Sequence, residues 1–110
     1  MEVKIFYYKT LSTEILMRLT SDKSRSLKWH KLQGNYMLVD AFSLNDEHGD
    51  NGQILHNIFE KYNDDDANPL SNKQEFIKEH NLHTSMSVTD VIHLDNDYYM
   101  VSGSGFEKMK

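Results

Sequence analysis

Two β-rich runs near the C-terminus, residues 87–94 and 98–102, constrain the fold of this chain more than any other feature. They are separated by the tripeptide Asp-Asn-Asp at 95–97, whose composition suits a tight turn between antiparallel strands. Glycines within residues 103–105 permit a bend or bulge before Phe106. The sequence therefore predicts a C-terminal β-hairpin followed by a change of chain direction.

Two earlier segments also have strand character. Residues 2–8 are rich in β-branched and aromatic side chains, and they place Val3, Ile5 and Tyr7 on one face. Residues 36–42 form a second predicted strand after the turn signal Gly-Asn, whereas residues 27–32 are either extended or a single turn. In the second strand we expect one face to carry Tyr36, Leu38 and Asp40 and the other Met37, Val39 and Ala41.

Helical periodicity lies between the strands. One continuous stripe over residues 54–62 predicts a helix that follows a loop at 46–52, is capped by Asp50 or Asn51, and is stopped by the polar run ending at Pro69. A second helix is predicted over residues 71–80, with Phe76 and Ile77 buried and Asn81 ending it in the left-handed conformation. A short amphipathic segment capped by Ser12 or Thr13 is also expected. The stripe consists of Ile54, Leu55, Ile58, Phe59 and Tyr62.

These elements predict an α+β fold in which two or three helices pack on a small, mostly antiparallel sheet of four or five strands. A chain of 110 residues suits a single domain, here residues 1–110. The absence of cysteine excludes disulfides, thiolate zinc sites and a cysteine nucleophile, and indicates a reducing, cytoplasmic setting. No apolar run approaches the roughly 20 residues that span a bilayer, and no secretory signal is expected.

Charge is distributed unevenly along the chain, which has a net charge of −5. Residues 1–40 carry seven Lys or Arg against four Asp or Glu, a net of +3, whereas residues 41–110 carry five against thirteen, a net of −8. Three acidic clusters are expected in exposed turns, since closely spaced like charges remain hydrated. We interpret them either as a solvated surface or as a face that binds a basic partner. The clusters contain Asp46, Glu47 and Asp50, then Asp64, Asp65 and Asp66, and finally Asp95 and Asp97.

A basic segment offers the alternative of direct nucleic-acid binding. Its cations surround an aromatic side chain that can stack on bases, although the overall negative charge disfavours phosphate contacts. The segment consists of Arg18, Lys23, Arg25, Lys28, Trp29 and Lys31.

A string near the C-terminus resembles the signature of the YodL-like domain, a small family of Gram-positive bacteria and their mobile elements. An apolar helix upstream, with Leu55, Ile58, Phe59, Tyr62 and Asn63, also fits this family. Thr84 is an extra residue after His83, and Ser102 stands where the family usually has Asp. No catalytic activity is attached to the family, and the resemblance implies a setting on phages, plasmids or integrative elements. The matching residues are Ser85, Ser87, Val88, Asp90, Val91, Tyr98, Tyr99, Val101, Gly105 and Phe106.

The same motif has a purely structural interpretation. The hydroxyls of Ser85 and Ser87 can bond nearby backbone groups, and the Asp90 carboxylate can accept turn amides. Gly105 permits the bend, while core positions would be taken by Val88, Val91, Ile92, Tyr99 and Phe106. We favour this interpretation over one in which the motif contacts a substrate.

Catalytic and metal-binding patterns are weak. His83 and Asp90 can pair as acid and base, but a role in stabilising the turn is favoured. The six histidines lack zinc spacing, the acidic run at 64–66 lacks the alternation of a calcium loop, and the serine at 104 lacks a nucleophile-elbow frame. We expect no enzymatic activity, no cofactor and no metal.

The expected function is that of a small acidic protein-binding domain. We interpret the chain as a phage or mobile-element accessory protein that inhibits a host nucleic-acid-handling or defence protein, for example an anti-CRISPR protein acting on an effector nuclease. The expected partner is a host protein, with no membrane, and a homodimer is left open. The alternatives are a nucleic-acid-binding regulator that uses the basic segment and a host-encoded modulator of growth or cell shape.

Overall fold

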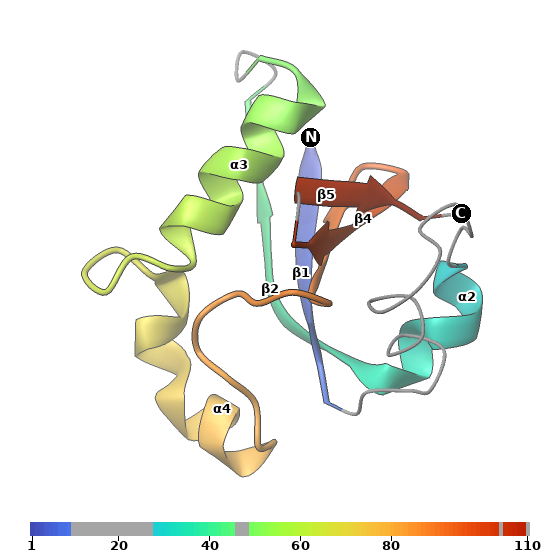
Figure 1. Ribbon diagram of the computed structural model, residues 1–110. Coiled ribbons are helices and arrows are strands. Elements are labelled where there is room, and N and C mark those ends of the chain that lie inside the picture. Colours follow the sequence, from blue (N-terminus) through green and yellow to red (C-terminus); the bar gives the residue numbers. More distant parts are fainter. Residues whose placement is uncertain (10–27, 46–48, 104, 110) are drawn as a thin grey trace.

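The first strand of the chain lies in the interior of a five-stranded sheet, between the second and third strands (Figure 1). This computed structural model describes residues 1–9, 28–45, 49–103 and 105–109. The predicted segment capped by Ser12 or Thr13 lies outside these residues. In chain order the elements are β1 (Glu2–Tyr8), α2 (Trp29–Leu32), η1 (Gln33–Asn35), β2 (Tyr36–Ser43), α3 (Asn51–Lys61), η2 (Pro69–Lys73), α4 (Gln74–Glu79), β3 (Val91–Leu94), β4 (Asp97–Ser102) and β5 (Gly105–Lys108).

The sheet has the order β2-β1-β3-β4-β5, and every neighbouring pair is antiparallel. The predicted C-terminal hairpin is confirmed, because Leu94 pairs with Asp97 across a two-residue turn in which Asp95 has φ 50°. β5 then adds to β4 beyond a second turn, where Gly105 has φ 139°, a conformation that side-chain-bearing residues rarely adopt. The predicted α+β fold is thus confirmed.

Each face of the sheet has its own hydrophobic cluster. Val3, Ile5 and Tyr7 are fully buried against α3, η2 and α4, as the alternation of β1 predicts. Phe6 and Tyr8 point to the opposite face and pack in a second cluster that contains Trp29. The segment predicted to be extended or a single turn therefore contributes the helical turn α2 to this second cluster through Trp29 and Leu32, while Leu27 lies outside the described residues.

The predicted helices are confirmed with small changes at their ends. Asp50 caps α3 by accepting a 2.8 Å hydrogen bond from the N–H of Gln53. The helix therefore begins at Asn51, whereas the sequence predicts a loop that extends to Gly52. The expected second helix is divided into the 3₁₀ turn η2 and the α-helix α4, with Pro69 at its start. Asn81 has φ 54° and ends this segment in the left-handed conformation.

Three details of the predicted strands and core are wrong. Ile5 pairs with Asp40 but Phe6 pairs with Leu38, so a bulge at Val39 breaks the simple alternation predicted for β2. β3 begins at Val91 rather than at residue 87, because the preceding residues form a turn. Val88 lies in that turn and is 39% exposed, so it is not part of the core.

Candidate functional site

Asp90 is the most connected polar side chain of the predicted motif. It is fully buried, and its Oδ1 accepts a hydrogen bond from the N–H of Tyr8 at 3.1 Å. Its Oδ2 accepts from the N–H of Ser87 at 2.7 Å and lies 2.6 Å from Nε2 of His83. One carboxylate therefore joins the end of β1 to the turn that precedes β3.

Two aromatic rings of β1 pack against the His83 side of this pair. The His83 ring stacks on Tyr7 with centroids 4.4 Å apart and an interplanar angle of 5°, and it contacts Tyr8 at 4.9 Å. Burial raises the pKa of Asp90, while the hydrogen bond and the charge of His83 oppose that rise. Burial, followed by the nearby Asp90 charge, also raises the pKa of Tyr7, whose hydroxyl donates to the carbonyl of Thr84 at 3.0 Å.

The backbone after the turn enters β3 through a strained residue. Thr89 has φ 83°, and its carbonyl accepts a 2.7 Å hydrogen bond from the hydroxyl of Tyr36. Its N–H donates to the carbonyl of Val101, whose own N–H donates to the carbonyl of Asp90. The motif thus closes a ring of contacts between β2, β4 and the turn, which agrees with the structural interpretation.

The other motif residues also have local roles. Ser85 is exposed, and the hydroxyl of Ser87 lies 3.4 Å from the carbonyl of Ser85. Gly105 begins β5, and the ring of Phe106 packs edge-on against Phe59 of α3 with centroids 6.2 Å apart. As a chemical unit, the His83–Asp90 pair can move a proton, but the hydrogen bonds found around it in the described residues hold backbone segments together.

The acidic clusters lie at separate places on the surface. Asp50 caps the start of α3, whereas the acidic loop, defined as Asp64, Asp65 and Asp66, follows its end, about 16 Å away along the helix axis. Asp95 lies at the β3–β4 turn and accepts a 2.8 Å hydrogen bond from the N–H of Glu2. Within the acidic loop, the Asp64 carboxylate accepts hydrogen bonds from two backbone N–H groups, whereas the carboxylates of Asp65 and Asp66 have no polar partner among the described residues.

The structure does not describe two of the predicted acidic residues and three of the predicted basic residues. Asp46 and Glu47, and likewise Arg18, Lys23 and Arg25, lie outside the described residues. Asp97 is half-buried and forms a 3.6 Å ion pair with Lys108.

The aromatic residue of the basic segment is buried. Trp29 is only 8% exposed and stacks on Tyr98 with centroids 4.7 Å apart, while Phe6 and Tyr36 contact its other sides. Its ring is therefore unavailable to stack on a nucleotide base. Lys28 and Lys31 remain exposed on either side of it.

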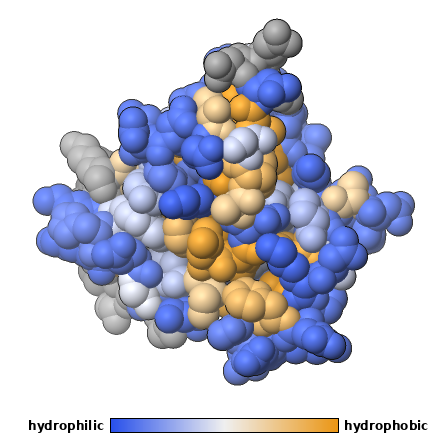
Figure 2. All heavy atoms as spheres, turned by 180° about the vertical axis from the view of Figure 1, so that it is seen from behind, coloured by the Kyte–Doolittle hydropathy of each residue, from blue (hydrophilic) through white to orange (hydrophobic). Residues whose placement is uncertain are grey.

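A surface along the edge strand β2 was not predicted from the sequence. β5 lies at the front in Figure 1 and β2 is the opposite edge of the sheet, so the back view in Figure 2 faces the β2 side, where hydrophobic residues gather in a band. We define the β2 band as Leu38, Phe42, Leu44 and Phe76. Leu38 is 45% exposed, and the other three are half-buried.

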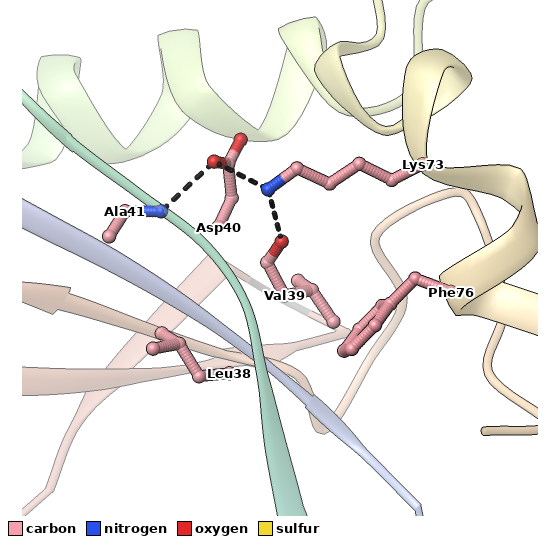
Figure 3. A pocket seen from close by; sticks show the side chains of 6 residues that line it. All are labelled: Leu38, Val39, Asp40, Ala41, Lys73 and Phe76. Atoms are coloured by element: carbon pink, nitrogen blue, oxygen red, sulfur yellow. Dashed lines mark hydrogen bonds and ion pairs between the residues drawn. The ribbon is translucent and has the colours of Figure 1, made fainter. Parts of the chain in front are cut away.

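Two hollows lie along this strand. The first, about 450 Å³, is lined by β2 residues 38–41 together with Lys73 and Phe76 (Figure 3). The second, about 250 Å³, is lined by Phe42, Leu44, Ile54, Asn57, Ile58 and Lys61.

A polar cluster stands at the first hollow. Lys73 reaches across to β2, where its Nζ donates to the carbonyl of Val39 at 3.0 Å and to Oδ1 of Asp40 at 3.2 Å (Figure 3). The hydroxyl of Tyr62 donates to Oδ2 of Asp40 at 2.6 Å, and the pKa of Tyr62 is raised by burial and then by this bond. A charged residue inside a predicted strand was the one sequence signal for this cluster, and the bulge at Val39 turns it toward the helices.

Neither a metal-binding cluster nor a membrane-spanning helix is present in the part of the chain that the structure describes. The described residues contain no group of three or more histidine, aspartate or glutamate side chains that could hold a metal ion. None of the helices in residues 1–9, 28–45, 49–103 and 105–109 has the length and apolar character of a membrane span.

Part of the chain is similar to a viral protein. Over 58 residues the chain is 48% identical to an uncharacterized protein of Acanthamoeba polyphaga mimivirus. This aligned stretch covers 51% of the chain and 53% of the viral protein. The match thus spans about half the length of that relative. No family model and no solved structure matches the chain. The resemblance to the YodL-like domain stays a prediction.

Proposed function

We propose that this chain is a non-enzymatic domain that acts by binding a basic surface of another protein. The observation that carries the proposal is the acidic loop, in which Asp65 and Asp66 are exposed and have no polar partner in the described part of the chain. Together with a net charge of −5, these carboxylates favour association with a positively charged partner.

The recognisable titratable pair supports the non-enzymatic part of this proposal. Asp90 is fully buried, and its carboxylate holds Tyr8 and Ser87 through their backbone N–H groups. His83 is held against the same carboxylate and against the ring of Tyr7. Each contact stabilises the fold, so the pair needs no substrate to account for its geometry.

The proposed partner is a host protein that handles nucleic acid, such as a defence nuclease or a CRISPR effector, because such proteins present basic grooves. In this setting the chain is a phage or mobile-element accessory protein in the cytoplasm of a bacterial host. The similarity to part of a mimivirus protein supports an origin in a virus.

The test is an inhibition assay with purified nucleases. We expect the protein to slow DNA cleavage and to co-elute with the enzyme, with an effect that weakens as salt is added. The double variant Asp65→Lys with Asp66→Lys should lose inhibition. Asp64 is left unchanged, since its carboxylate holds the backbone of the loop.

A matched control separates local from global charge. Glu75→Lys with Glu79→Lys makes the same change in net charge at exposed positions of α4, and it should keep inhibition. Unaltered cleavage without co-elution would remove the proposal, and equal losses in both double variants would show that only net charge matters.

A further inference from the structure

We propose that the β2 side is the docking surface for an extended segment of the basic partner, which seats one apolar side chain in each hollow and directs basic side chains toward the acidic loop. This inference rests on the proposed function, because it specifies how the partner binds. The surface combines the β2 band with the two hollows, the first of which is lined in part by the Asp40 cluster.

The hydrogen-bonding groups in the middle of β2 are already used, so the segment binds through its side chains. The N–H of Ala41 donates to Oδ1 of Asp40 at 2.9 Å, and the carbonyl of Val39 accepts from Lys73. The bulge at Val39 further disrupts the regular edge that strand addition requires. A bound segment therefore lies over the hollows and does not extend the sheet.

The two hollows set the spacing of the apolar anchors. They adjoin consecutive parts of the chain, residues 38–41 of β2 and then Phe42 with Leu44, which follows the end of β2. At about 3.3 Å per residue, the midpoints of these two chain segments are about 12 Å apart, a distance that an extended segment spans with four residues. Side chains four apart in an extended chain point to the same side, so both anchors can enter together.

Along β2, Asp40 lies between Leu38 at the first hollow and Phe42 at the second, so the segment passes the Asp40 cluster on its way from one anchor to the other. The Asp40 carboxylate is shared by Tyr62 and Lys73, so this point is polar and its charges are balanced. A polar residue two positions after the first anchor would face it. The predicted pattern is apolar, any residue, polar, any residue, apolar.

Charge selects a basic segment. The acidic loop begins directly after the second hollow, since the N–H of Asp64 bonds to the carbonyl of Lys61, which lines that hollow. Lys61 contributes one positive charge against three carboxylates, while the charge of Lys73 is balanced by Asp40. A second copy of this chain, with a net charge of −5, would be repelled.

The test uses three synthetic peptides of equal length and ¹⁵N-labelled protein. The first carries leucines four residues apart with lysines at the flanks, the second replaces lysine by glutamate, and the third replaces leucine by serine. In NMR titrations we expect the first peptide to shift the amides of β2 and of residues 61–76. The second and third peptides should leave these amides unchanged.

Leu38→Ser should weaken binding of the leucine–lysine peptide about tenfold, as expected for the loss of one apolar anchor contact. Val88→Ser is the matched control, because Val88 is also a large exposed apolar residue, at 39%, and lies outside the β2 band. Equal weakening in both variants, binding of the glutamate peptide, or absence of shifts at millimolar peptide would overturn the inference. Sedimentation that shows a wild-type dimer abolished by Leu38→Ser would instead assign the surface to a second copy.

Failure of this inference is distinguishable from failure of the proposed function. If Asp65→Lys with Asp66→Lys releases an inhibited nuclease but Leu38→Ser does not, the acidic loop binds the partner and the β2 band does not. If the wild-type protein inhibits no nuclease, the peptide titrations still report on the band.

Discussion

The carboxylate of Asp90 accepts a hydrogen bond from the backbone N–H of Tyr8, a residue 82 positions earlier in the chain. Tyr8 is the last residue of β1, and Asp90 directly precedes β3, the strand that pairs with β1. A single buried side chain therefore fixes where the interior strands β1 and β3 begin to pair. The same carboxylate orders the turn through Ser87.

Asp90→Asn should lower the free energy of unfolding by about 2–3 kcal/mol. The amide NH₂ group of asparagine is itself a donor, so it would face one of the N–H groups that now donate to the Asp90 carboxylate. Urea denaturation monitored by circular dichroism measures this loss. Asp65→Asn, a change at an exposed position, is the control and should alter stability little. Equal stability of the two variants would contradict a central role for the Asp90 carboxylate.

The environment of Trp29 gives a second prediction. It is the single tryptophan of the chain and is 8% exposed, so its fluorescence should be blue-shifted in the folded protein and poorly quenched by acrylamide. Trp29→Ala should lower the free energy of unfolding by about 3–5 kcal/mol, as is typical when a large aromatic side chain is removed from a core. Solvent-like emission that changes on addition of DNA or RNA would instead favour the nucleic-acid-binding alternative.

Much of the fold follows from local patterns. The turn chemistry at Asp95, the cap at Asp50 and the stripe of α3 each depend on residues close in sequence, and each was predictable. The bulge at Val39 was not, because it depends on how β2 pairs with β1. The exposure of Val88 was also missed, because the contacts of Asp90 turn the chain before it enters β3.

The candidate surfaces were predictable to a lesser degree. Charge runs in turns identify exposed carboxylates such as Asp65 and Asp66 from sequence alone. The hollow beside Leu38 depends on Lys73 and Phe76, which come from a segment more than thirty residues later. No periodic pattern of the sequence places those side chains beside β2.

We expect His93 to make the free energy of unfolding decrease as the pH falls from neutral to mildly acidic values. Burial, followed by the charge of Lys4, lowers its pKa below 6.5, although Asp95 and Asp97 oppose this, and its Nδ1 is buried without a partner in the described structure. The imidazole stacks on Tyr98 with centroids 4.1 Å apart. Below pH 6.5 the unfolded chain binds a proton that the folded chain does not, so the free energy of unfolding decreases as the pH falls through the lowered pKa.

Urea denaturation between about pH 7 and about pH 5 measures this slope, a range in which histidine is the side chain that ordinarily titrates. His93→Gln should flatten the dependence of stability on pH. His56→Gln is the control, since that histidine is exposed and pairs with Glu60 on the surface of α3. A slope that His56→Gln removes and His93→Gln leaves would contradict the assignment.

Lys73→Met should increase self-association through β2. The change keeps the aliphatic stem but removes the ammonium group from the carbonyl of Val39, which can then accept from another chain at about 1 kcal/mol per net hydrogen bond. Sedimentation at several protein concentrations measures the dimer fraction. Lys78→Met, at an exposed position of α4, should leave the dimer fraction as it is in the wild-type protein, and identical behaviour of both variants would show that Lys73 does not protect the edge.

The interior position of β1 has a consequence for how the chain folds. Val3 pairs with Leu94 of β3 on one side and with Phe42 of β2 on the other. The pairing of β1 therefore cannot be completed until β3 has been synthesised. Contacts this distant in sequence slow folding, because a long loop must be ordered before they form. A ribosome-bound chain interrupted before β3 would hold β1 with one unpaired edge, and such an intermediate is a natural target for chaperones.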